Sequence, residues 1–243
     1  MKVTGPLANR RVRQAIAYAF DYDALNKGVL GGRSRQPLGP IPFGVWGLDE
    51  TLKPYRRDIE RARKLMAEAG HPQGGFNVTI QTIVAFGWWQ TRKAQILQQN
   101  LSELGIKATI DDKADAATFL RAIWAKEKGP NMYFWTSRNS IDDPDFEMRR
   151  MYHSAFTGAR GVNGMWYSNR LLDKLFDEAL ESTDIARRKA VYVRIQRLLY
   201  DDVPALWAAQ TNWYITRRDA VQNYLWNPFS IGVPNFYQLW LSR

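Results

Sequence analysis

The chain has 243 residues, a formal net charge of +10 and no cysteine. This length suffices for one large domain or two small ones, and the lack of cysteine excludes disulfides, zinc–thiolate sites and thiol chemistry. The cations are scattered along the chain, which favours a solvated basic surface over a nucleic-acid patch. No apolar run reaches the 18 residues of a membrane span, and the first six residues lack the apolar core of a signal peptide.

Helices and strands alternate in the first part of the predicted structure. Apolar spacing, capping residues and β-branched runs predict helices over residues 9–19, 21–25, 58–70, 90–104 and 116–128, and strands over residues 76–84, 106–110 and 132–135. A loop rich in Gly and Pro covers residues 31–47 and contains large apolar residues, so we expect it to pack across a surface. Alternating strands and helices favour an α/β fold in which helices connect the strands of one sheet.

The rest of the chain is predicted to be mostly helical. Helices are expected over residues 168–181 and 185–200, followed by a strand over residues 205–215 and a tail of turns and short apolar pieces. Asp111 and Asp112 are expected in a loop before a helix.

Catalytic motifs are missing from the sequence. It has two histidines, His71 and His153, and no Gly-x-Ser-x-Gly, Walker or Gly-x-Gly-x-x-Gly motif. We expect both histidines at or near the surface. The cluster Asp142-Asp143-Pro144-Asp145 lacks the alternating spacing of a calcium loop. The sequence therefore predicts a protein that is not an enzyme and has no metal site or cofactor.

Six spaced motifs resemble one family, the bacterial extracellular solute-binding proteins of family 5, in its C-terminal half. The matching segments, in order, are VRQAIAYAFD at residues 12–21, RDIERARKLMAEAG at 57–70, LSELGIKA at 101–108, the segment from Trp135 to Asp145, YSN and DKL at 167–175, and the stretch from Asp184 to Pro204. No single motif is specific for the family, but the occurrence of all six in the same order over about 230 residues is specific for it.

The resemblance implies a fold and a role. The fold would be an α/β, type II periplasmic-binding-protein-like lobe, with a mixed sheet flanked by helices. Residues 7–211 would form the second ligand-binding lobe, and residues 212–243 would cross the hinge to complete a first lobe that this chain lacks. The protein would be the periplasmic, or extracellular and membrane-associated, substrate-binding component of an ABC importer. Its partners would be a peptide or related polar solute, a membrane permease and the missing N-terminal lobe.

Seven residues are candidate ligand contacts. They are Trp88, Trp89, Trp135, Arg138, Asp142, Trp207 and Gln210. Peptide receptors of the family place an acid after the tryptophan that aligns with Trp135, where this chain has Arg138; this reversal would favour a carboxylate or phosphate. Asp142 or Asp143 could supply the lost acid. Alternatively, Asp143-Pro144-Asp145 is a helix-capping turn, and Trp88, Trp89, Trp207 and Gln210 serve core packing.

Three other roles remain open from the sequence. The same fold occurs as the ligand-sensing domain of transcription regulators, and an upstream winged-helix segment would distinguish that role. The ligand could also be an oligosaccharide or an opine. Non-specific nucleic-acid binding driven by the positive charge is a further alternative, which the salt dependence of binding would test.

Overall fold

A computed structural model of the chain describes residues 1–113, 115–126, 129–137, 141–158, 161–212, 214–225 and 236–242. The α-helices are α1 (Arg10–Ala19), α2 (Ile59–Glu68), α3 (Trp88–Ser102), α4 (Ala116–Trp124), α5 (Pro144–Tyr152), α6 (Arg170–Leu180) and α7 (Ile185–Asp202). The strands are β1 (Ser34–Arg35), β2 (Asn77–Ile83), β3 (Lys107–Lys113), β4 (Met132–Tyr133), β5 (Gln210–Thr211), β6 (Val221–Gln222) and β7 (Trp240–Leu241). Short 3-10 turns cover Gly5–Ala8, Val84–Phe86, Ser154–Phe156 and Phe236–Gln238, and a π-helical segment covers Ala24–Val29.

A three-stranded sheet with the order β3-β2-β4 organises the first part of the chain. Both strand pairs are parallel, with Ile80 of β2 opposite Ile110 of β3 and Met132 of β4. Helix α3 connects β2 to β3, and α4 connects β3 to β4, because parallel neighbours need a crossover connection. The predicted α/β class is confirmed. The antiparallel pairs, β1 with β5 and β6 with β7, are short ladders outside this sheet.

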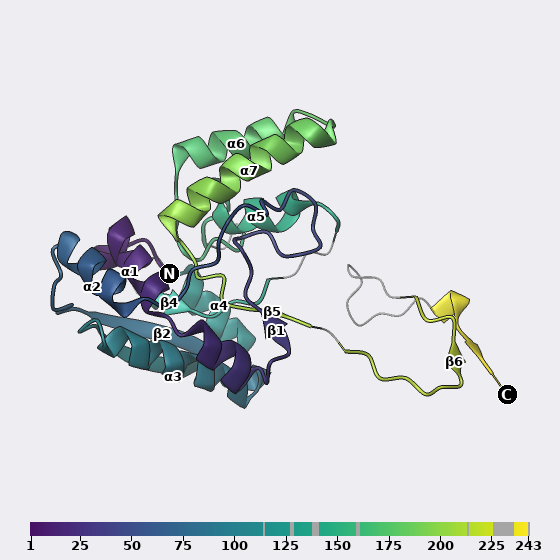
Figure 1. Cartoon of the computed structure of the whole chain (residues 1–243), viewed down its shortest axis with the longest axis horizontal. Helices are drawn as coiled ribbons and strands as arrows, with labels where there is room; N and C mark the ends of the chain where they lie inside the picture. Colours follow the sequence, from purple (N-terminus) through teal and green to yellow (C-terminus); the bar gives the residue numbers. More distant parts are fainter. Residues whose placement is uncertain are drawn as a thin grey trace.

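Two large hydrophobic cores hold the packed body together, and a smaller one around Ile83, Phe119 and Ile123 packs α4 against β2. One joins α1, α2 and α3 to the sheet, with Val12, Ile16 and Met66 at most 1% exposed. The other joins α5, α6 and α7 to the loop around Ile41, and Figure 1 shows α6 and α7 side by side beyond α5. The loop over residues 31–47 therefore packs as expected, with Ile41 fully buried.

Several predicted boundaries were wrong, and three of them have a clear physical reason. Helix α3 begins at Trp88, because Gly87 at φ 112° ends the preceding turn there. Asp111 and Asp112 lie in β3, not in a loop, since β3 pairs with β2 along its whole length and tertiary pairing overrides the low strand propensity of aspartate. The strand expected over residues 205–215 is only Gln210–Thr211, because its partner β1 has two residues.

The first three residues are tied to the packed body. The amine of Met1 donates to the carbonyl oxygen of Pro204 at 2.9 Å, and the backbone N–H of Val3 donates to that of Met165 at 2.9 Å. Burial lowers the pKa of the Met1 amine from 8.0 to about 5.

The tail runs away from the body (Figure 1). Neither of the two large cores includes a described residue beyond 211. Strands β6 and β7 pair with each other, and Phe236 and Trp240 remain 72% and 57% exposed. No helix in the described ranges is long and apolar enough to cross a bilayer.

Candidate functional site

The carboxyl edge of the β3-β2-β4 sheet is the candidate binding site. Because the three strands are parallel, the segments that follow them emerge at the same edge. In open α/β sheets this edge is where ligands bind. The start of α3 follows β2, the start of α4 follows β3, and Phe134 and Trp135 follow β4. Three of the seven predicted contacts, Trp88, Trp89 and Trp135, therefore come from this edge.

Two adjacent tryptophans are the first residues of α3. Trp88 is 70% exposed, whereas Trp89 is half-buried, so the two side chains have different surroundings, as expected for neighbours on a helix. Gly87 permits this arrangement. Its φ is 112°, and a Cβ there would lie 2.5 Å from the Nε1 atom of Trp89. A glycine is required for Trp89 to fold back over the turn.

Lys93 is a candidate functional residue that the sequence interpretation missed. Its Nζ atom lies 4.1 Å from the ring centre of Trp89 and 5.7 Å from that of Phe134. Within the described part of the chain, no carboxylate pairs with it. Burial lowers the pKa of Lys93 from 10.5 to about 8. The spacing of four residues from Trp89 places the two on one helix face, which is the signal that could have identified it.

The segment after β4 carries two predicted contacts. Trp135 is 36% exposed and directly follows Phe134, the second ring beside Lys93. Arg138 lies outside the described residues, so the proposed charge reversal at that position stays a prediction.

The aspartate cluster before α5 has a structural role. Asp143 caps α5 by accepting from the backbone N–H of Asp145 at 2.9 Å, and it pairs with Arg188 at 2.7 Å. This confirms the alternative of a capping turn. Asp142 is exposed, and its backbone carbonyl accepts from Nε1 of Trp46 at 2.7 Å. Its carboxylate makes no hydrogen bond to the described residues, and its role as a ligand contact stays a prediction.

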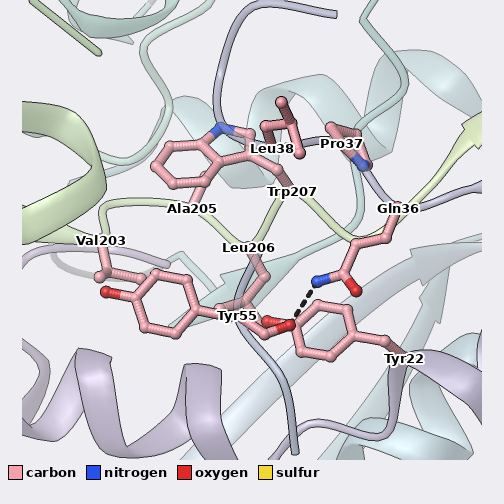
Figure 2. A pocket seen from close by; sticks show the side chains of 9 residues that line it. All are labelled: Tyr22, Gln36, Pro37, Leu38, Tyr55, Val203, Ala205, Leu206 and Trp207. Atoms are coloured by element: carbon pink, nitrogen blue, oxygen red, sulfur yellow. Dashed lines mark hydrogen bonds between the residues drawn. The ribbon is translucent and has the colours of Figure 1, made fainter. Parts of the chain in front are cut away.

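Trp207 and Gln210 lie on the segment that follows α7. The Nε1–H of Trp207 donates to the hydroxyl of Tyr152 at 3.0 Å. Figure 2 shows the Trp207 ring beside Leu38 in a narrow pocket, which has no space for a water molecule. The amide of Gln210 accepts from the N–H of Phe43 at 2.9 Å and donates to its carbonyl at 3.1 Å. Both side chains therefore hold structural contacts, and their roles as ligand contacts stay predictions.

The histidines lie near the surface as expected. His71 packs edge-on against Phe76, and Nδ1 of His153 accepts from the N–H of Ala155 at 3.0 Å. Among the residues that the structure describes, no group of three or more His, Asp or Glu side chains is arranged to hold a metal ion.

Comparison with known proteins identifies the family. A profile described as "Bacterial extracellular solute-binding proteins, family 5 Middle" matches residues 1–159. The chain belongs to this family. The predicted family is thereby confirmed, and this family is made of binding proteins.

Similar proteins match most or all of this chain but are longer than it. "Di/tripeptide-binding protein 2" of Pseudomonas aeruginosa is 31% identical over 93% of this chain and 42% of its own length. "Glutathione-binding protein GsiB" of Pectobacterium atrosepticum is 29% identical over 84% of this chain and 40% of its own. The solved structure of HbpA2 from Haemophilus parasuis is 27% identical, with a TM-score of 0.86 over all of this chain and 47% of that one. The chain spans less than half the length of these relatives.

Proposed function

We propose that this chain is the second ligand-binding lobe of the substrate-binding component of an ABC importer. The ligand would be a peptide or a related polar solute that bears a carboxylate. It would lie against the carboxyl edge of the β3-β2-β4 sheet, and the protein would release it unchanged to a membrane permease.

One observation carries the proposal about the ligand. The ammonium of Lys93 lies beside the rings of Trp89 and Phe134 and has no carboxylate partner among the described residues. A partly buried ammonium without a partner is unfavourable by itself, and an anionic ligand group would supply the missing partner. Aromatic walls with a few placed polar groups are typical of small-ligand sites. A peptide carboxylate fits this chemistry, and the exposed ring of Trp88 would pack against the peptide residues next to that carboxylate.

The second wall of the site would come from a first lobe that corresponds to the part of the relatives that this chain does not match. Residues 212–243 would cross the hinge to that lobe. The exposure of Phe236 and Trp240 supports this division, because two large apolar side chains then gain a partner surface. The location would be periplasmic, as in the solute-binding proteins that supply ABC importers.

The names of the relatives support a peptide as the ligand. One is described as binding di- and tripeptides and another as binding glutathione. Both kinds of ligand carry a free carboxylate, which is the group that Lys93 would receive. Trp135 would line the same site, and Arg138 would supply a second cation.

Trp indole resonances in NMR spectra of the purified chain test the proposal, because they detect weak binding at a site that is open on one side. Di- and tripeptides, opines and oligosaccharides would be added to about 10 mM, which detects dissociation constants in the millimolar range. Peptides are expected to shift the indole signals of Trp88 and Trp89, assigned with the variants Trp88→Phe and Trp89→Phe. The absence of a shift with every compound would contradict the proposal.

A further inference from the structure

A hollow with a volume of about 540 Å³ lies at the other end of α3 from Trp88. It opens between α1, α7 and the loop that leads into α2. Arg57, which lines it, pairs at 2.7 Å with Glu103, the residue that follows α3. Trp88 begins the same 15-residue helix. At about 1.5 Å per residue the helix is about 22 Å long, so the hollow is separate from the carboxyl edge.

Three tyrosines form a fixed wall of this hollow. The rings of Tyr55 and Tyr200 stack with centres 4.7 Å apart, and Tyr18 packs edge-on against Tyr55 at 4.9 Å. The hydroxyl of Tyr55 donates to the carbonyl of Tyr200 at 3.0 Å, and that of Tyr200 donates to the carbonyl of Lys53 at 2.7 Å. The wall is therefore held by its own contacts and is formed before any ligand binds.

Cations outnumber carboxylates around the hollow. Lys53, Arg56, Arg57 and Arg61 line it, with Asp58 as the one lining carboxylate. Asp58 is engaged as the cap of α2, since its Oδ1 accepts from the backbone N–H of Arg61 at 2.9 Å. The like charges repel one another, and an oxyanion between them would relieve that repulsion.

Three of these cations, Lys53, Arg56 and Arg61, have no acidic partner in the described ranges; Arg56 donates to the amide oxygen of Gln36 at 3.4 Å. The guanidinium of Arg61 lies over the ring of Tyr18, 4.2 Å from its centre, which orients its N–H groups without using them. The ammonium of Lys53 is exposed and makes no ion pair there. Elsewhere the fold neutralises arginines directly, as Arg188 with Asp143 at 2.7 Å and Arg149 with Asp145 at 2.9 Å. The hollow therefore presents free donors on a rigid wall.

We infer that this hollow binds a phosphate-type oxyanion. A guanidinium and an ammonium both form strong, charge-assisted hydrogen bonds to a phosphate-type anion, and the volume lies in the range of small-ligand sites. The tyrosine wall keeps water from one side of the anion, which strengthens its attraction to the cations. This inference does not depend on the proposed peptide site, because its test uses no peptide.

Isothermal titration of the full chain with pyrophosphate tests the inference. Arg61→Gln and Lys53→Gln are each expected to weaken binding about tenfold, the value of one charge-assisted hydrogen bond. Arg63→Gln is the matched control, because Arg63 is exposed on the same helix and does not line the hollow; its affinity should equal that of the unmodified chain. Equal weakening by Arg63→Gln and Arg61→Gln would overturn the inference, since it would indicate general surface charge.

Co-sedimentation with vesicles distinguishes a lipid headgroup from a free anion. Vesicles of phosphatidylglycerol are compared with vesicles of phosphatidylcholine, using the same variants. If the chain binds pyrophosphate but not the anionic vesicles, the ligand is a soluble anion. If it binds the anionic vesicles but not pyrophosphate, and this binding requires Arg61, the ligand is a membrane headgroup. Either outcome supports an oxyanion site. Binding of neither would overturn the inference.

Discussion

Replacing Lys93 with methionine is expected to stabilise the chain in the absence of ligand. Methionine retains an unbranched apolar stem against Trp89 and Phe134 and removes a partly buried cation. Burial lowers the pKa of Lys93 from 10.5 to about 8. At about 1.4 kcal/mol per pKa unit this shift corresponds to at most about 3.5 kcal/mol, and partial exposure to solvent reduces the expected gain to about 1–2 kcal/mol.

The gain should depend on pH with a defined sign. The pKa of Lys93 is lower in the folded chain than its ordinary value of 10.5, so the unfolded chain binds more protons between pH 8 and 10.5. Stability of the unmodified chain therefore rises with pH in that window. The advantage of Lys93→Met is largest below pH 8 and disappears towards pH 10.5. Lys2, whose pKa burial also lowers to about 8, contributes equally to both proteins and cancels in the difference.

Urea unfolding at several pH values between about 7 and 10 measures this difference. Lys64→Met is the matched control, because Lys64 is exposed on α2, and its unfolding free energy should change by less than about 0.5 kcal/mol. A Lys93→Met variant that is less stable than the unmodified chain by about 1 kcal/mol or more would refute the reasoning. It would mean that the ammonium already has a stabilising partner.

Three further predictions concern other positions. Gln196→Leu removes an amide that accepts from the N–H of Asp49 at 3.1 Å and donates to the carbonyl of Gly47 at 2.7 Å. Because two backbone groups then lose their hydrogen-bond partners, urea unfolding should show that the free energy of unfolding falls by about 2–4 kcal/mol. Gly105→Ala places a Cβ 2.1 Å from a backbone oxygen at a φ of +72°, and thermal unfolding should show a loss of similar size, about 2–4 kcal/mol. Trp88→Ala removes a ring that is 70% exposed; stability should stay within about 0.5 kcal/mol while peptide affinity falls, and unchanged affinity would remove Trp88 from the site.

Much of the fold was predictable because its signals are local. Asn9, Asp58 and Asp184 cap α1, α2 and α7 through their side chains, and apolar spacing marks the buried face of each helix. The errors arose where tertiary pairing decides the structure. β3 continues through Asp111 and Asp112 because β2 offers a partner along its whole length.

The candidate site was predictable in part. The alternation of strands and helices places the segments that contain Trp89 and Trp135 at one edge of the sheet. Lys93 was missed because a lysine in an amphipathic helix usually faces solvent. Its partial burial depends on Phe134, 41 positions further along the chain, and no local pattern reports that contact. The structural role of Gln210 could not be predicted either, since its hydrogen bond is to the backbone of Phe43, far away in the sequence.

The proposed site requires the carboxyl edge of the sheet to bind a ligand carboxylate, and a double comparison of affinities measures this most directly. Binding of one tripeptide, as the free acid and as the C-terminal amide, is determined for the unmodified chain and for Lys93→Met by NMR titration. The unmodified chain is predicted to prefer the free acid about tenfold, a coupling of about 1.4 kcal/mol, and Lys93→Met is predicted to lose this preference. Equal discrimination between acid and amide in the two proteins would contradict the account.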